Sequence, residues 1–324
     1  MANWEYNNKY IQSYNLKIKN IQELEKYIHT STNLRPNFNV LNSDIVIPRI
    51  FVSIVGIENS ENEYYDKILD LKNALSSYND LFLFIDSMEV NLNAHLTTKF
   101  EEAWNKVRLY NDIQSNQVIK IFKEFNLFPK LPNKYLEKQI SDNLEGIIDY
   151  YFEVSHDLVD ELEMKNILLT IIHFLNFNFF VFFKEFDYVS KNPKIMYYGD
   201  INKSLCYTLI YFSSLGVDII YLNQYSDKEL LNADPFFQFF HRIEYSRKLF
   251  PKPFPTAKTI QTIETPASLA QTEIRRFLFN EETKMYMDKQ LNSSKMHSVH
   301  LKTTYDEIGI WIKDEKTVRH GFKN

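Results

Sequence analysis

Residues 194–222 constrain the fold of this chain more than any other segment. The run KIMYY is typical of a buried strand, Gly199 interrupts it, and apolar residues then recur at helical spacing over residues 202–215. Gly216 ends the helix, and VDIIYL is the next strand. Two strands joined through a helix are parallel with a right-handed connection. We therefore predict an α/β fold with Rossmann-like parallel βαβ units and many additional helices.

The first part of the chain shows a similar alternation. Residues 1–30 have helical spacing, and residues 44–57 are apolar and β-branched, which predicts a strand. Pro48 places the first half of that strand at a sheet edge or at the entry point of the strand. A helix is predicted over residues 63–78, followed by a short strand at 81–86.

The domain organisation is predicted from breaks in these patterns. Residues 95–127 read as helical, and the proline-containing FPKLP that follows is the best linker in the chain. We predict an N-terminal α/β region over 1–132 and a Rossmann-like α/β domain over 133–260. Residues 261–324 are expected to form a C-terminal helical segment, with a helix at 268–291, and to begin a second repeat.

An apolar run at residues 167–183 is about the minimum length that spans a bilayer. Polar side chains interrupt its middle, and acidic residues precede it as at the start of a helix. We therefore predict a buried helix within residues 156–186 rather than a membrane span. The interrupting side chains are those of His173, Asn176 and Asn178.

Composition and charge narrow the classes of function. A single cysteine, Cys206, excludes an intrachain disulfide and a thiolate-rich metal centre, and its apolar neighbours predict burial. The 37 basic and 42 acidic residues give a net charge of −5, which supplies no overall attraction to nucleic acid or an anionic membrane. No apolar stretch follows a basic start at the N-terminus, so no secretion signal is expected. We predict a cytoplasmic protein that binds neither nucleic acid nor membranes.

The sequence also matches itself at one constant offset, between residues 23–38 and 307–322. Arg35 aligns with Arg319, and the surrounding acidic, apolar and aromatic positions keep their order. We predict that residues 300–324 begin a second unit or dock as a tail on the first. The alternative is a coincidence between two amphipathic helices.

Several segments together resemble the bacterial YceG-like family. They are IPRIFVSIVGI with the following EYY, PKIMYYGDI with LGVDIIYLN, ETPASLAQTEIRRFLF, and LKTTYDEIGIW. The resemblance implies a short or truncated member of a family described as a component of a biosynthetic module and associated with tellurite resistance and stress response. It implies no catalytic residue or cofactor for particular positions.

The best candidate site lies beyond the carboxyl ends of the predicted parallel strands, where open α/β sheets bind ligands. Gly199 permits close approach of the backbone, free amides at the helix start can hold an anion, and Lys203 adds a positive charge. We predict a site for a nucleotide or another phosphorylated metabolite formed by Gly199, Asp200, Asn202, Lys203 and Asn223, with Gln224 nearby. The alternatives are a helix cap for Asp200, a solvated charge for Lys203 and a turn for Asn223.

Other charged residues are weaker candidates. Asp86 ends the strand at 81–86 and can bind a ribose hydroxyl or a divalent cation, or cap a helix. Arg242, Arg247 and Lys248 can clamp a phosphate if they face the site, or lie solvated on the surface. Histidine and aspartate pairs at 156–160 and 297–300 lack a third ligand, so no metal site is predicted.

Two functions therefore stay open. The first is binding of a nucleotide or phosphorylated metabolite in a stress-linked biosynthetic step. Neither GxGxxG nor GxxxxGK[ST] occurs, so nicotinamide-dependent chemistry is not expected. The second is a non-catalytic module whose aromatic helices, at 167–183 and 235–250, dock proteins of the same gene cluster. The residues identify no cofactor and no catalytic group.

Overall fold

The computed structural model describes residues 9–90, 92–110, 112–131, 133–155, 159–179, 182 and 192–258. One compact unit, Met1–Lys258, contains all of them. The predicted helix at 268–291, the second copy of the repeat and the whole region 261–324 lie outside the described residues.

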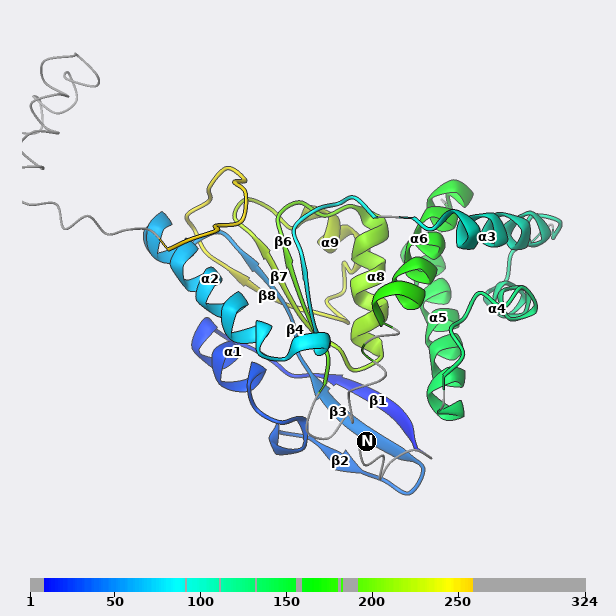
Figure 1. Cartoon of the computed structure of the whole chain (residues 1–324), viewed down its shortest axis with the longest axis horizontal. Coiled ribbons are helices and arrows are strands. Elements are labelled where there is room, and N and C mark those ends of the chain that lie inside the picture. The colour runs from blue at the N-terminus through cyan, green and yellow to red at the C-terminus, as the bar shows by residue number, and fades with distance from the viewer. Residues whose placement is uncertain are drawn as a thin grey trace, which may run out of the picture. The chain divides into compact units, whose positions relative to one another are not determined.

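A five-stranded parallel sheet forms the centre of this unit (Figure 1). Its strands are β4 (Phe51–Val55), β5 (Phe82–Ile85), β6 (Lys194–Tyr198), β7 (Asp218–Asn223) and β8 (His241–Glu244), in the order β5-β6-β7-β4-β8. Every neighbouring pair is parallel, which confirms the predicted α/β fold.

The segment that most constrained the fold has the predicted structure. Helix α8 (Lys203–Ser214) connects β6 to β7, and the two strands are adjacent and parallel. Gly216 adopts a φ of 85°, and the next amide, of Val217, donates to the Phe212 carbonyl at 3.2 Å. The helix therefore ends in a left-handed turn that a glycine accommodates without strain.

Helices cover both faces of the sheet, as Figure 1 shows. Helices α1 (Ile21–Ile28) and α2 (Glu61–Ser76) pack on the face that Met196 and Tyr198 line. Helix α8 packs on the opposite face, with Ile195 and Tyr197. The chain crosses the sheet in one direction from β4 to β5, and in the other direction from β6 to β7 and from β7 to β8. Because such crossovers are right-handed, α2 and α8 lie on opposite faces of the sheet.

Helices between β5 and β6 extend the α8 side. They are α3 (Ala94–Val107), α4 (Ser115–Glu124), α5 (Lys134–Ser155) and α6 (Glu161–Phe174), continued by a π-helical turn at Leu175–Phe179. The predicted helix at 95–127 is therefore two helices. The first part of the apolar run, from Ile167 to Leu175, is largely buried as predicted, whereas Phe177 is exposed. Within the described residues no helix combines the length and apolarity needed to cross a bilayer.

A second, three-stranded sheet corrects the interpretation of the N-terminal part. Strand β1 (Tyr10–Asn15) lies in a segment with helical spacing and pairs in parallel with β3 (Asp44–Arg49), which also pairs with β2 (Asn39–Val40). The first half of the predicted strand at 44–57 is thus the middle of a small sheet, not an edge. Pro48 is tolerated there because β2 pairs only with Ile45 and Val46.

Residues 235–250, predicted as an aromatic helix, form strand β8 and irregular backbone instead. The carboxylate of Asp234, the residue after α9 (Lys228–Ala233), accepts hydrogen bonds from the amides of Gln238 and Phe239 at 2.9 and 2.8 Å. Phe237 has a φ of 54°. The left-handed backbone of Phe237 and the bonds to the Asp234 carboxylate thus fix a local turn in place of the predicted helix.

The linker at residues 128–132 joins elements of one unit. Strands β4 and β5 precede it, β6, β7 and β8 follow it, and all five lie in the same sheet. The segments before and after position 132 therefore both contribute strands to the same sheet.

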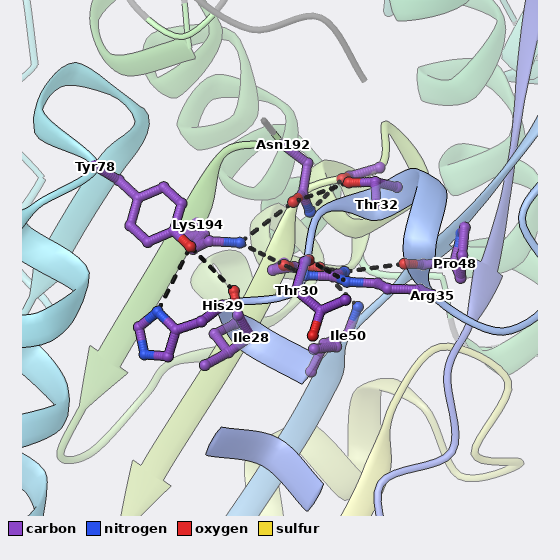
Figure 2. A network of polar contacts seen from close by, with 12 residues as sticks. Ile28, His29, Thr30, Thr32, Arg35, Pro48, Ile50, Tyr78, Asn192 and Lys194 are labelled. Carbon is purple, nitrogen blue, oxygen red and sulfur yellow. Dashed lines mark hydrogen bonds and ion pairs between the residues drawn. The ribbon is translucent and has the colours of Figure 1, made fainter. Parts of the chain in front are cut away.

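A buried polar network lies at the amino ends of β6 and β7 (Figure 2). The Lys194 ammonium contacts the Asn192 side-chain oxygen at 3.2 Å and the Asp218 carboxylate at 2.8 Å. It also lies 4.7 Å from the centre of the Tyr78 ring. Thr32 donates to the same Asn192 oxygen at 3.2 Å. The network thus joins the segment after α1 to the amino edge of the large sheet.

Candidate functional site

The carboxyl ends of β5, β6 and β7 are neighbours along one edge of the sheet. Asp86 follows β5, residues 199–203 follow β6, and Asn223 ends β7. The structure therefore brings these sequence-predicted residues to a common edge, the place where open parallel sheets bind ligands.

The turn at residues 199–203 is open above its glycine. Gly199 has a φ of 99°, and a methyl group on its Cα would meet no heavy atom within 4 Å. The following Asp200 is exposed. Asn202 caps helix α8, since its side-chain oxygen accepts from the Leu205 amide at 2.9 Å. The cap is thus Asn202 rather than Asp200, and the remaining first-turn amides of α8 face the start of the helix.

Asn223 holds the turn in place. Its side-chain amide donates to the Gly199 carbonyl at 3.0 Å and to the Asp200 carboxylate at 3.1 Å. Its side-chain oxygen accepts from the amides of Tyr225 and Ser226 at 2.8 and 2.9 Å. Asn223 is therefore a turn residue, and it positions the turn at 199–203.

Lys203 is paired across the helices. Its ammonium lies 2.6 Å from the Glu163 carboxylate on α6, and the Tyr151 hydroxyl donates to the same carboxylate oxygen at 2.9 Å. The lysine and glutamate side chains are 28% and 31% exposed, so both reach solvent. An anion at the turn would compete with Glu163 for this lysine.

Two carboxylates lie near the buried Tyr197. Its hydroxyl donates to the Asp200 carbonyl at 2.7 Å. Burial raises the pKa of Tyr197, and the negative charges of Asp200 and Asp86 add to that effect. The carboxylates of Asp200 and Asp86 therefore lie at the same part of the edge, close to the Tyr197 hydroxyl.

The predicted phosphate clamp is not at this turn. Arg242 lies on β8, and β7 and β4 separate that strand from β6. Its guanidinium donates three hydrogen bonds to the carboxylate of the buried Asp227, at 2.9, 3.0 and 3.2 Å, and also pairs with Glu244. Lys248 lies 2.8 Å from Glu244.

The third member of the clamp, Arg247, donates to the Asn59 carbonyl at 3.2 Å. Strand order therefore keeps Arg242 away from the turn, and local partners occupy all three basic side chains.

Other candidates have structural roles. Cys206 is fully buried, and burial raises the pKa of its thiol well above the usual value. The thiol therefore stays protonated and packs as a small apolar side chain. Asp160 caps α6, while His156, Asp157 and residues 297–300 lie outside the described part. Within that part, no group of three or more His, Cys, Asp or Glu side chains is arranged to hold a metal ion.

Sequence reasoning missed Glu163 and Tyr151, the partners of Lys203. The only signal for them was an acidic first turn in α6, which also suits the helix dipole.

Comparisons with known proteins agree with the resemblance. The family model described as the YceG domain matches residues 18–279. An uncharacterized protein YceG from Bacillus subtilis (strain 168) is 22% identical over 284 residues, which cover 85% of this chain and 50% of that protein. The chain thus spans about half the length of this relative. No solved structure gave a significant match.

Proposed function

The chain belongs to the YceG family, and we propose that it binds a nucleotide or another phosphorylated metabolite at the carboxyl edge of its parallel sheet. The observation that carries this proposal is the open turn at Gly199, which meets the N-terminus of α8 beside Lys203. A phosphate there would accept hydrogen bonds from backbone amides and gain from the helix dipole.

The carboxylates define the rest of the ligand. Asp86 and Asp200 repel a bare phosphate, but they accept hydrogen bonds from the hydroxyls of a ribose or another sugar. A nucleotide supplies both groups, with its phosphate at the helix and its ribose toward the acids. The cytoplasm, where such metabolites are made, is the proposed location, and a stress-linked biosynthetic step is the proposed context.

A thermal-shift screen with nucleotides, nucleotide sugars and divalent metals tests this proposal. A nucleotide should raise the melting temperature of the wild-type chain. Lys203→Ala should weaken binding by roughly tenfold, as loss of a charge-assisted contact does. Lys120→Ala, on an exposed position of α4, is the matched control and should leave binding unchanged.

Glu163→Gln provides the sharper test because it should strengthen nucleotide binding, whereas Lys203→Ala should weaken it. Removing this carboxylate charge frees Lys203 from its 2.6 Å ion pair, so binding of the nucleotide should tighten. If Lys203 serves only the fold, Glu163→Gln would leave binding unchanged, and the proposed role of the turn would be wrong.

A second candidate function is docking of a partner protein. Phe236 and Phe237 lie side by side in the sequence and are 57% and 47% exposed, which is unusual for adjacent large apolar side chains. A screen in which no nucleotide raises the melting temperature would favour this function.

A further inference from the structure

Residues 245–254, here called the strap, cross the carboxyl edge of the sheet after β8. The strap begins by pairing with β4 and β7: its Tyr245 amide donates to Val55 at 2.8 Å, and its Leu249 amide donates to Gln224 at 3.0 Å. It ends with Phe254, whose ring packs edge-on against Tyr198 of β6 and Phe84 of β5, at 5.0 and 4.6 Å between centroids. The strap thus covers four strand ends on the α2 face.

A cluster of neutral polar side chains lies beneath the strap. Gln224 is fully buried, and its side-chain amide donates to the hydroxyls of Tyr198 and Tyr65. The Tyr198 hydroxyl in turn donates to the Lys252 carbonyl of the strap at 2.8 Å. The Tyr64 ring meets that of Tyr65 edge-on at 5.4 Å.

Two buried atoms of this cluster have no hydrogen-bond partner among the described residues. They are the side-chain oxygen of Gln224, an acceptor, and the hydroxyl of Tyr64. Burial raises the pKa of Tyr64 well above its usual value, so this hydroxyl stays protonated and is a donor. Buried polar atoms nearly always have a partner, so two unpaired atoms in one cluster indicate a missing one.

The position of the cluster agrees with a ligand site. The chain leaves β4 toward the α2 face and leaves the adjacent β7 toward the α8 face. A parallel sheet binds ligands beyond strands whose connections diverge in this way. The strap lies across that point.

The chemistry of the cluster selects the ligand. Its hydrogen-bonding groups are phenols and an amide, and no charged side chain bonds to any of them in the described residues. A neutral acceptor and a neutral donor fit the hydroxyl groups of a polyol, and aromatic rings fit its C–H faces. Phe250 of the strap stacks on Tyr225 with 6.2 Å between the ring centroids, and the two side chains are 82% and 55% exposed.

We propose that this cluster binds a neutral polyhydroxylated ligand, a sugar or related polyol, and that the strap closes over it. One ligand hydroxyl donates to the Gln224 oxygen and another accepts from Tyr64. Backbone bonds to β4 and β7 fix the start of the strap, and Phe254 fixes its end. Residues 250–253 between them are exposed, and the Tyr198 hydroxyl and the surface ion pair of Lys252 with Glu61 hold them. Surface ion pairs contribute little stability, so this middle part of the strap can lift to admit the ligand. The proposal needs no phosphate and rests on other residues than the turn at 199–203.

Saturation-transfer NMR with D-glucose, D-galactose, D-ribose and myo-inositol tests the site on the full chain. At least one of the four should receive saturation, and Tyr64→Phe should weaken its binding by about five- to tenfold. The matched control is Tyr207→Phe, which removes another buried, unpaired hydroxyl, on the α8 face, and should leave polyol binding unchanged. No signal from any of the four, or the same loss in both variants, would overturn the proposal.

The stability of the free chain gives an independent readout. Because the Tyr64 hydroxyl has no partner, Tyr64→Phe should not lower the melting temperature. Tyr150→Phe should lower it, since it removes a 2.7 Å hydrogen bond to the buried Asp234. If Tyr64→Phe lowers the melting temperature as much as Tyr150→Phe, a buried water already satisfies the hydroxyl, and no ligand is required.

Discussion

Arg35 and Asp218 form a two-point ion pair although 183 positions separate them in the sequence. The guanidinium nitrogens lie 2.8 and 2.6 Å from the two carboxylate oxygens, and both side chains are completely buried. The carboxylate also accepts from the Ile50 amide at 2.9 Å and from Lys194. One buried aspartate therefore joins β6, β7 and the junction between the two sheets, and it balances two buried cations.

Asp218→Asn should destabilise the chain by about 3–5 kcal/mol at neutral pH, because it leaves Arg35 and Lys194 buried without a counter-charge. The free energy of unfolding, measured in urea, checks this. Glu58→Gln is the control, since Glu58 pairs with Lys67 on the surface and should change the free energy little. A cost for Asp218→Asn as small as that of the control would contradict the role of the pair.

The free energy of unfolding should decrease in acid because Asp218 becomes protonated. Burial alone would raise the pKa of Asp218, but the charges of Arg35 and Lys194 outweigh burial and hold it well below its usual value. The unfolded chain binds this proton first, so the contribution is present above about pH 3.9 and is lost as the pH falls below it. The free energy of unfolding of Asp218→Asn should fall less steeply over that range than that of the wild type.

Lys194 should make the free energy of unfolding depend on pH in the alkaline range. Burial lowers its pKa to about 8, with Asp218 opposing the shift and Arg35 adding to it. Between pH 8 and 10.5 the unfolded chain holds a proton that the folded chain has released, so stability gains as the pH rises. The free energy of unfolding of the wild type, relative to that of Lys194→Met, should therefore increase as the pH rises through this window. A constant difference would contradict the shifted pKa.

Asn202→Ala should cost about 1 kcal/mol through loss of the α8 cap. Denaturant unfolding measures it, and Asn116→Ala, an exposed asparagine within α4, should cost nothing. If the two substitutions changed the free energy of unfolding equally, the stabilising role of Asn202 as the cap of α8 would be wrong.

Local signals predicted the elements that depend on local sequence. Gly216 and the apolar spacing of α8 define a βαβ unit without reference to the rest of the chain. Strand β1 escaped prediction because the exposure of its residues follows from pairing with β3, some thirty positions later. The apolar spacing also continues across the break between α3 and α4, so periodicity alone reads one helix there.

The shared edge of the candidate site residues was predictable from the sequence, but the contacts that these residues make were not. Strand topology placed Asp86, Gly199 and Asn223 at one edge. The pairing of Lys203 with Glu163 depends on how α6 packs against α8, and the repeat drew attention to Arg35 without its partner Asp218. Sequence spacing carries no information on such contacts between distant segments.

The most direct test of ligand binding at the carboxyl edge is a two-dimensional NMR titration of the isotope-labelled chain with the nucleotide that gives the largest thermal shift. We expect the largest chemical-shift changes in the backbone amides of residues 199–203 and in the side-chain amide of Asn223. Changes confined to the amino edge around Lys194 and Asp218, or no changes at saturating nucleotide, would contradict it.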